Sequence, residues 1–459
     1  MFDCPQNLRE EEMFEVPEWA ANKVVYQIFP SRFAATEPVD KELWYKAPIT
    51  PMDDLHGNLR GIIEHMDDIQ NLGIDVLYMT PIFQSNSCHK YDTTDYYKID
   101  PSFGTTEDLK ELVQKAHERG MKVVLDAVYN HTGREFFAFA DILENGEKSK
   151  YRDWYFIDGF PLKSEWGEIP NFKCFGYYGG MPKLNLKNPE VEKYITDVAC
   201  YWIKECDIDG WRLDVGDEIS HFFWKNFRKA VKAVKKDLLI IGEIWHYAGD
   251  FLEGDEWDTV MNYPFYLNLI DLLADEKITV SQFVQNLGYL KGRLNKNCYP
   301  LMWNLIDSHD TARFLHLCND NKKKQHLAAA FQLLLPGMPM IYYGDEYAMP
   351  GANDPDCRRG MYWDEEYQDK EMYEWYKRLI QVRKSHACIV EGELAGSVTE
   401  DEEGTIVLIR KNGEETIAMI FNCSSSAKKF NEYTQKYNLL TENTFDGNVE
   451  GFDAAVIVL

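Results

Sequence analysis

Eight short apolar runs, separated by segments of helical periodicity, constrain the fold of this chain more than any other feature. The runs are continuous rather than alternating, which is typical of parallel strands buried on both faces. Residues 59–72 and 107–119 carry apolar residues at helical spacing, and a glycine follows each segment. This alternation predicts an α/β fold, a (β/α)8 TIM barrel. Its strands are expected at residues 24–29, 76–79, 122–128, 210–215, 238–244, 259–263, 301–307 and 340–344.

Two regions depart from this alternation. Residues 131–183 are rich in Gly, Pro, Trp, Tyr and Phe and lack a helical period, which indicates a small domain inserted after the third strand. From about residue 386, apolar and polar residues alternate between turn residues, which predicts a C-terminal antiparallel β-sandwich. We therefore expect a barrel of residues 1–130 and 184–385, an inserted domain of residues 131–183 and a C-terminal domain of residues 386–459.

Charge and composition narrow the class of ligand. The net charge of −27 argues against nucleic acid and against an anionic membrane surface, because phosphate binding needs clustered Lys and Arg. A neutral ligand fits better. Aromatic residues make up 14% of the chain, and flat aromatic faces suit sugar rings, although a Tyr-rich core would have the same composition.

Compartment is predicted from cysteine usage and from the N-terminus. The ten cysteines include no CxxC pair, which favours reduced thiols and a cytoplasmic location. Residues 1–14, MFDCPQNLREEEMF, have neither the basic start nor the apolar stretch of a signal peptide. No apolar run approaches the length that spans a membrane.

Charged residues stand at the predicted carboxyl ends of several strands, where barrel proteins gather their functional groups. In the stretch GWRLDVGDE, Arg212 and Asp214 are two residues apart and therefore point to one side of a strand. Glu243 lies at the end of the fifth predicted strand, and Asp310 follows the seventh. Each carboxylate alone is explained by a buried ion pair or a helix N-cap. Three together, at one edge of a barrel, indicate a site, because buried charge is costly.

Paired carboxylates are the groups that glycoside hydrolysis requires. One attacks the anomeric carbon, and the other protonates the leaving oxygen; retention of configuration needs about 5–5.5 Å between them. Neighbouring strands lie about 4.8 Å apart, so the fourth and fifth can supply this spacing. We expect Arg212 to lower the pKa of Asp214 and keep it ionised as the nucleophile. Glu243, after an apolar run and near a tryptophan, is the expected general acid and base, and Asp310 the group that holds sugar hydroxyls.

Four motifs, DAVYNH, GWRLDVGDE, GEIWH and SHD, resemble in sequence and order the short conserved regions of the α-amylase superfamily, glycoside hydrolase family 13. The resemblance covers nearly the whole chain and implies the same three catalytic residues, Asp214, Glu243 and Asp310. It also implies that subsite −1 is held by Tyr91, His131, Arg212 and His309. It implies that the next sugar on the non-reducing side contacts Asp354 and Arg358, and that Asp92 and Asp126 support the architecture. Trp245 either borders the +1 side or serves packing.

The stretch MPKLN at residues 181–185 resembles the neopullulanase, cyclomaltodextrinase and maltogenic amylase group. Many members of that group carry an N-terminal β domain, for which the first strand at Val24 leaves no room, so dimerisation by that route is in doubt. No cofactor is expected to be required. Asn130 matches a calcium ligand of many α-amylases, but the loop after the first strand lacks the Asn/Asp-rich pattern of calcium-binding relatives, so a structural calcium ion stays open.

The leading hypothesis is a retaining hydrolase of α-1,4-glucosidic bonds, with some α-1,6 cleavage, acting on maltooligosaccharides, cyclodextrins or related α-glucans through a covalent glucosyl-enzyme intermediate. The alternatives are a transglycosylase, an α-glucosidase or a phosphorylase of the same family, and a noncatalytic relative. We expect no nucleic-acid or membrane partner. The preferred substrate and the oligomeric state are left open by the sequence.

Overall fold

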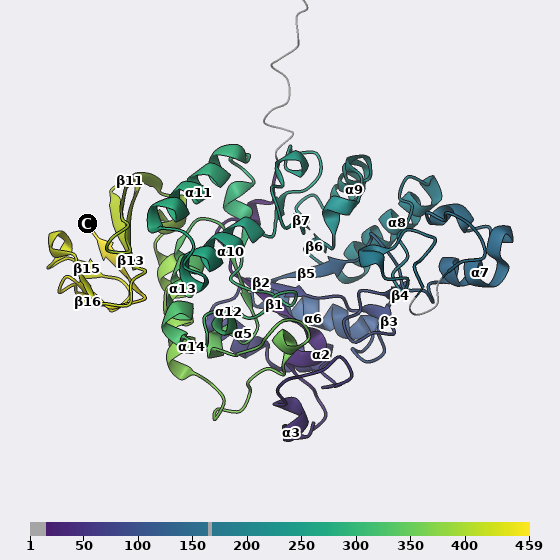
Figure 1. Cartoon of the computed structure of the whole chain (residues 1–459), viewed down its shortest axis with the longest axis horizontal. Helices are drawn as coiled ribbons and strands as arrows, with labels where there is room; N and C mark the ends of the chain where they lie inside the picture. The colour runs from purple at the N-terminus through teal and green to yellow at the C-terminus, as the bar shows by residue number, and fades with distance from the viewer. Residues whose placement is uncertain (1–14, 164–167) are drawn as a thin grey trace, which may run out of the picture.

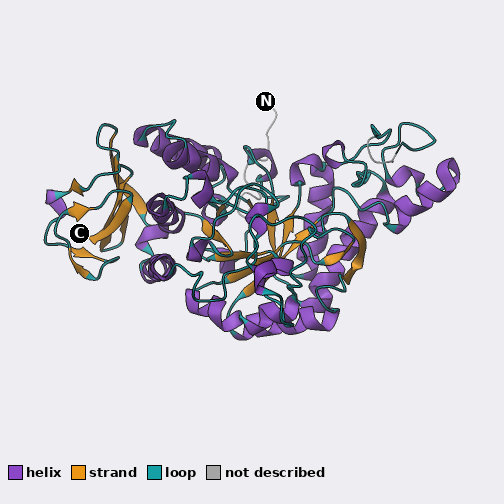
Figure 2. Cartoon of the chain, turned by 60° about the horizontal axis from the view of Figure 1, so that its bottom comes forward, coloured by secondary structure: helices purple, strands orange, loops and turns teal. Residues whose placement is uncertain are grey.

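A computed structural model describes residues 15–163 and 168–459, so the prediction made for residues 1–14 lies outside the described residues. Its centre is a parallel sheet of eight strands in the order β8-β7-β6-β5-β2-β1-β10-β9 (Figures 1 and 2). A parallel bridge between Met261 and Trp303 joins the two edge strands and closes the barrel. The predicted barrel is therefore confirmed. Its strands are β1 (Val25–Ile28), β2 (Val76–Met79), β5 (Lys122–Ala127), β6 (Gly210–Leu213), β7 (Leu239–Gly242), β8 (Thr259–Val260), β9 (Trp303–Asn304) and β10 (Met338–Tyr342).

Most of the predicted strands end earlier than the apolar runs do. The run 210–215 leaves the sheet after Leu213, and Val215 has a left-handed backbone with φ +47°. The run 301–307 pairs only over Trp303 and Asn304. Beyond these points Leu305 and Ile306 are fully buried, whereas Val215 is only partly buried, because it carries the chain into the loops at the mouth of the barrel.

Amphipathic helices surround the barrel (Figure 2). The segment 59–72 is two helices rather than one, because the backbone leaves the helical region at His65, and Gly73, at φ +101°, ends the second. The main helices are α4 (Leu59–Glu64), α5 (Met66–Leu72), α6 (Thr106–Glu118), α8 (Pro189–Cys206), α9 (His221–Val234), α10 (Tyr263–Leu269), α11 (Val280–Arg293), α13 (Lys322–Leu334) and α14 (Lys370–Ser385). Shorter ones are α2 (Pro30–Phe33), α3 (Lys41–Trp44), α12 (Phe314–Leu317) and α15 (Cys388–Glu391).

The described part of the segment 131–183 extends from the barrel beside β5 and α8 (Figure 1). It holds α7 (Phe137–Asn145), short 3₁₀ turns and isolated bridges such as Ile157 with Phe172. Next to it lies a hairpin of β3 (Phe83–Ser85) and β4 (Thr93–Ile99). Aromatic side chains pack the interior of the segment 131–183, where Phe139 contacts Tyr155 and Phe172, and this accounts for its richness in Tyr and Phe.

The C-terminal region, at the yellow end of Figure 1, is antiparallel as predicted. One face of its six-stranded sheet packs on the barrel, where Phe421 stacks on Phe331 of α13 at 4.3 Å between ring centroids. The other face packs against a two-stranded ribbon. The large sheet consists of β11 (Glu393–Glu400), β12 (Thr405–Asn412), β13 (Glu415–Asn422), β18 (Asp453–Val458), β15 (Tyr437–Asn438) and β16 (Asn443–Thr444), and the ribbon of β14 (Lys428–Lys429) and β17 (Asn448–Val449).

Within residues 15–163 and 168–459, none of the helices has the length and apolar character needed to cross a membrane.

Candidate active site

Arg212 is the centre of a charge cluster at the carboxyl end of the barrel. Its side chain is fully buried and lies at ion-pair distance from four carboxyl groups. The distances from its guanidinium nitrogens are 3.0 Å to Asp126 Oδ1, 3.0 Å to Asp214 Oδ1, 2.9 Å to Glu243 Oε2 and 3.9 Å to Asp310 Oδ2. The three carboxylates that the sequence placed at separate strand ends therefore converge on one cation.

The turn after β6 brings two of these carboxylates together. The backbone of Val215, in its left-handed conformation, aims its N–H at Glu243 Oε2, which accepts the hydrogen bond at 2.9 Å. The amide of Glu243 in turn donates to the carbonyl of Leu213 at 3.0 Å. Gly242 precedes Glu243 because a Cβ at that position would stand 2.2 Å from the ring of Trp257. The strand ends thus hold the Asp214 and Glu243 carboxyl groups on the same guanidinium, that of Arg212.

The electrostatics of Asp214 differ from the expectation. Burial raises the pKa of Asp214 well above its ordinary value, and the opposing effect of Arg212 is smaller. The negative charges of Glu243, Asp126 and Asp310 raise it further. The pKa of Asp126 rises to about 6, again through burial, with Arg212 opposing. One guanidinium therefore acts in the predicted direction but does not offset the burial of several carboxyl groups.

A hydrogen-bonded chain lies beneath the cluster. The Tyr91 hydroxyl lies between His309 Nε2 and Asp126 Oδ2, the latter at 3.0 Å. Gln27 Nε2 donates to His309 Nδ1 at 2.7 Å, so the neutral ring carries its proton on Nε2. Burial, together with the charges of Arg358 and Arg212, holds the pKa of His309 well below its ordinary value. The neutral His309 ring therefore directs its Nε2–H towards the Tyr91 hydroxyl, and Asp310 Oδ2 lies 3.2 Å from the same nitrogen.

Charged and aromatic groups form the rim. Arg358 contacts Asp354 at 2.8 Å and Asp310 at 3.4 Å, and its Nε donates to the His309 carbonyl at 2.8 Å. On another side, Trp245 Nε1 donates to Glu243 Oε1 at 3.1 Å. The Trp245 ring stacks on Tyr263 with 4.0 Å between ring centroids. Trp245 is therefore hydrogen-bonded to Glu243, the expected acid, and does not serve packing alone.

A cleft of about 430 Å³ opens above the cluster. Eight of the ten predicted site residues line it: Tyr91, His131, Asp214, Glu243, Trp245, Asp310, Asp354 and Arg358. The other two, Arg212 and His309, lie behind these and contact them. Within the part of the chain that the structure describes, Asp214 Oδ2 has no hydrogen-bond partner, although Oδ1 is held by Arg212.

Four further residues line the cleft and were not predicted: His89, Phe175, Met181 and Val215. His89 lies two residues before Tyr91 in HKYDTTDY, and Met181 begins MPKLN, so the motifs contained a signal for both. Phe175 had none, since an aromatic residue in the segment 131–183 packs or faces the cleft according to the fold. It stacks on His131 at 5.1 Å, and burial lowers the pKa of that histidine to about 4.

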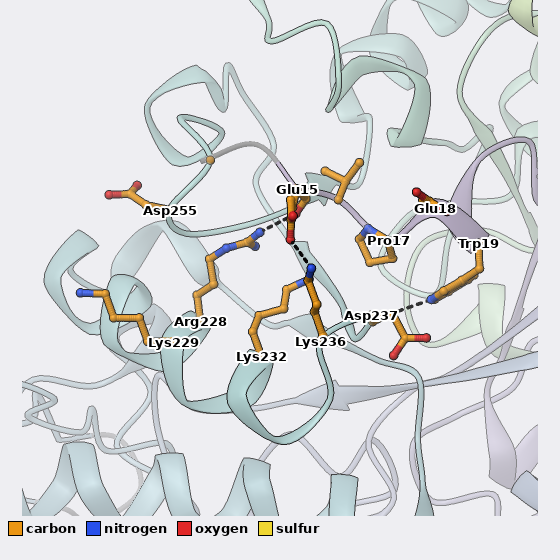
Figure 3. A pocket seen from close by; sticks show the side chains of 12 residues that line it. Glu15, Pro17, Glu18, Trp19, Arg228, Lys229, Lys232, Lys236, Asp237 and Asp255 are labelled. Atoms are coloured by element: carbon orange, nitrogen blue, oxygen red, sulfur yellow. Dashed lines mark hydrogen bonds and ion pairs between the residues drawn. The ribbon is translucent and has the colours of Figure 1, made fainter. Parts of the chain in front are cut away.

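A larger hollow, of about 800 Å³, lies at the opposite end of the barrel, before the start of β7 (Figure 3). Most of its charged groups are engaged with one another or with the barrel: Arg228 and Lys232 bind Asp258, and Lys236 binds Glu15. The converging carboxyl groups lie in the smaller cleft, so size alone does not identify the reacting site.

The residues around Asn130 do not fit a calcium ion. Asn130 Nδ2 donates to Glu218 Oε2 at 3.2 Å, and the Lys183 ammonium binds the same oxygen at 2.6 Å. Asn130 Oδ1 has no hydrogen-bond partner among the described residues, so this oxygen would be available to a metal ion. However, the Lys183 ammonium already neutralises the neighbouring Glu218 carboxylate, which a calcium ion would need as a ligand. Across residues 15–163 and 168–459, no three His, Cys, Asp or Glu side chains gather as a metal site.

Comparisons with known proteins identify the family to which the chain is similar. Residues 27–392 match the family described as alpha amylase, catalytic domain. A cyclomaltodextrinase of Geobacillus thermopakistaniensis is 46% identical over 92% of this chain and 72% of its own. A solved cyclomaltodextrinase superposes with a TM-score of 0.92 and 38% identity over 97% of this chain and 79% of its own. The ligand-free cyclic α-maltosyl-(1→6)-maltose hydrolase of Arthrobacter globiformis superposes with a TM-score of 0.88 and 36% identity, over 96% of this chain and all of its own.

Proposed function

This chain belongs to the α-amylase family of glycoside hydrolases, and from that premise we propose that it cleaves α-1,4-glucosidic bonds, and some α-1,6 bonds, with retention of configuration. The substrates are maltooligosaccharides, cyclodextrins or related α-glucans. The observation that carries the proposal is the pair of carboxyl groups, Asp214 and Glu243, held on one guanidinium at the base of a cleft.

Asp214 is the nucleophile. Arg212 fixes its Oδ1, and the unpartnered Oδ2 is the atom available to attack the anomeric carbon. A bond forms between C1 and Oδ2 while the bond from C1 to the leaving oxygen breaks. The negative charge of Glu243 is among the causes that raise the pKa of Asp214, so a proton on Glu243 favours ionised Asp214. Protonated acid and ionised nucleophile therefore support each other in the starting complex.

Glu243 donates that proton to the leaving oxygen. The carboxylate left behind accepts hydrogen bonds from the Val215 amide and from Trp245 Nε1, and it lies at 2.9 Å from Arg212. These contacts hold it for the second half-reaction, in which it takes a proton from water. Water then attacks C1, the bond to Asp214 breaks, and the product has the α configuration. This chemistry requires no organic cofactor.

The remaining groups hold the sugar. Asp310, with an imidazole on one side and Arg358 on the other, is placed to accept hydrogen bonds from hydroxyls of the reacting glucose. Tyr91 and His131 bound the same cleft, and Asp354 with Arg358 bounds the side of the next sugar towards the non-reducing end.

The test uses Asp214→Asn and Glu243→Gln, assayed on maltooligosaccharides. Each is expected to lose several orders of magnitude in kcat, and early products of the wild type should be α-anomers by proton NMR. Near-normal activity of either variant, or a β-anomeric first product, contradicts the mechanism. Product sizing with and without phosphate and sugar acceptors separates hydrolysis from phosphorolysis and transglycosylation, and release of single glucose units identifies an α-glucosidase.

We further propose a cytoplasmic location and the domain limits expected from the sequence. The nine cysteines in the described part of the chain are free thiols, as a reducing compartment would keep them.

A further inference from the structure

A second pocket, also of about 430 Å³, lies beyond Trp245, on the outer side of the cleft. Trp245 lines both hollows, so the ring is a shared wall. The rest of the second pocket comes from the loop after β7, from α10 and the turn that follows it, and from α11. Its lining residues include Tyr247, Leu267, Asn268, Asn286, Tyr289 and Arg293.

Exposed apolar side chains gather in this pocket. Trp245 is 42% exposed, Leu267 45% and Tyr289 66%, all on one surface. Large apolar groups are usually turned inward, and a cluster that faces water in a hollow marks a binding surface.

The aromatic rings are held in place rather than free. The Arg293 guanidinium lies over the Tyr247 ring at 3.9 Å from the centroid and over Tyr289 at 5.1 Å. Arg293 Nη1 donates to the Tyr289 hydroxyl at 3.0 Å, and the Tyr247 hydroxyl donates to the Arg293 carbonyl at 2.9 Å. The rings of Tyr247 and Tyr289 are thus already ordered before a ligand binds. Binding therefore loses little side-chain entropy at these two positions.

Polar groups stand beside these faces. Asn286 Nδ2 donates to Asn268 Oδ1 at 2.8 Å, and Asn268 Nδ2 donates to the carbonyl of Phe283 at 3.1 Å. Asp271 adds a carboxylate to the wall. Flat apolar faces beside amide and carboxylate groups match a sugar ring, whose C–H faces are apolar and whose edge carries hydroxyls.

The position decides which part of the substrate reaches the pocket. Trp245 Nε1 is bonded to Glu243, the group that protonates the leaving oxygen, so Trp245 stands on the leaving-group side. We propose that the pocket beyond Trp245 binds the distal glucose units of the leaving-group chain of a long α-glucan. This inference rests on the proposed function. It makes the enzyme favour long chains over short ones.

The test is a comparison of chain lengths in the double variant Leu267→Ala/Tyr289→Ala. The value of kcat/KM on linear maltooctaose is expected to fall about tenfold, since about 1.4 kcal/mol of contact is lost, while that on maltotriose changes less than about twofold. Tyr437→Ala, at a 48% exposed tyrosine of β15, is the matched control and should change neither value. An equal fall on both substrates, or no fall on either, overturns the proposal.

Binding without turnover separates this proposal from the proposed function. In a Glu243→Gln background, titration calorimetry with maltooctaose should show about tenfold weaker binding once Leu267 and Tyr289 are replaced. An unchanged affinity for maltooctaose overturns the inference. If the replacements instead change the sedimentation behaviour and leave the chain-length preference as it was, the pocket is an interface between copies of the chain and the inference is also overturned. A wild type inactive on every α-glucan contradicts the proposed function, whereas loss of binding in the variant would still support the pocket.

Discussion

The two ends of the barrel treat buried carboxyl groups in opposite ways. At the amino end, Asp209 precedes β6 and is paired with two ammonium groups, Lys122 at 2.9 Å and Lys235 at 2.9 Å, while the His117 ring lies 2.7 Å from its other oxygen. Five residues later, just past the carboxyl end of β6, Asp214 shares Arg212 with other carboxyl groups. The pKa of Asp209 is held well below its ordinary value by these partners in spite of burial, whereas burial raises that of Asp214. A surplus of cations stabilises the fold, and a deficit leaves carboxyl groups able to hold and exchange a proton.

The largest expected effect breaks the carboxyl end. Asp214→Asn should lower kcat by about 10⁴-fold or more, because the attacking oxygen is lost. Asp209 lies at the other end of the barrel, away from the cleft. Asp209→Asn should therefore keep kcat within about twofold of the wild type at temperatures where the variant is folded. Steady-state kinetics on maltooligosaccharides compare the two, and an equal loss in both variants would show that the contrast between the ends is wrong.

The next effect breaks the amino end. Asp209→Asn leaves the neighbouring lysines without their buried partner and should lower the free energy of unfolding by about 3–5 kcal/mol. Urea denaturation at pH 7 measures this, with Asp67→Asn as the control, since Asp67 is largely exposed and its loss should cost under about 0.5 kcal/mol. Asp214→Asn should not destabilise to a similar degree; if it does, the carboxyl cluster is structural in the same sense as Asp209.

The pH dependence of stability should have opposite signs at the two ends. Asp209 has a lowered pKa, so its stabilisation is present above about pH 4 and is lost as pH falls below that. Asp214 has a raised pKa, so its contribution is present below about pH 4 and is lost as pH rises. Relative to wild type, Asp214→Asn should therefore gain stability as the pH rises from about 4 to 7, and Asp209→Asn should lose stability as the pH rises from about 2 to 4. Unfolding curves from about pH 2 to pH 7 check the two slopes, and curves parallel to that of the wild type in both windows would refute them.

The smallest effect concerns calcium. Because the Lys183 ammonium occupies the carboxylate beside Asn130, chelation with EDTA should shift the Tm by less than about 1 °C. Differential scanning calorimetry with and without added calcium measures this. A shift of several degrees, abolished by Asn130→Ala but not by Asn295→Ala, would show that a calcium ion binds there after all.

The sequence predicted the strands from their apolar runs because a strand buried on both faces needs apolar residues throughout. It predicted the convergence of Asp214, Glu243 and Asp310 because parallel strands in a barrel end at one face. It did not predict where the strands stop. The turn at Val215 depends on a left-handed residue that no local preference favours, and it is held by Glu243, which is distant in the chain.

What the sequence by itself determined is the architecture and the identity of the charged residues, since periodicity and motif order are local properties. Only the tertiary structure decided the balance of charge around each carboxyl group, because burial and the count of cations within reach depend on side chains from many elements. The sequence placed an arginine two residues before Asp214 and so predicted a lowered pKa. The fold shares that arginine among Asp126, Asp214 and Glu243, and the desolvation of a closed barrel outweighs a single cation.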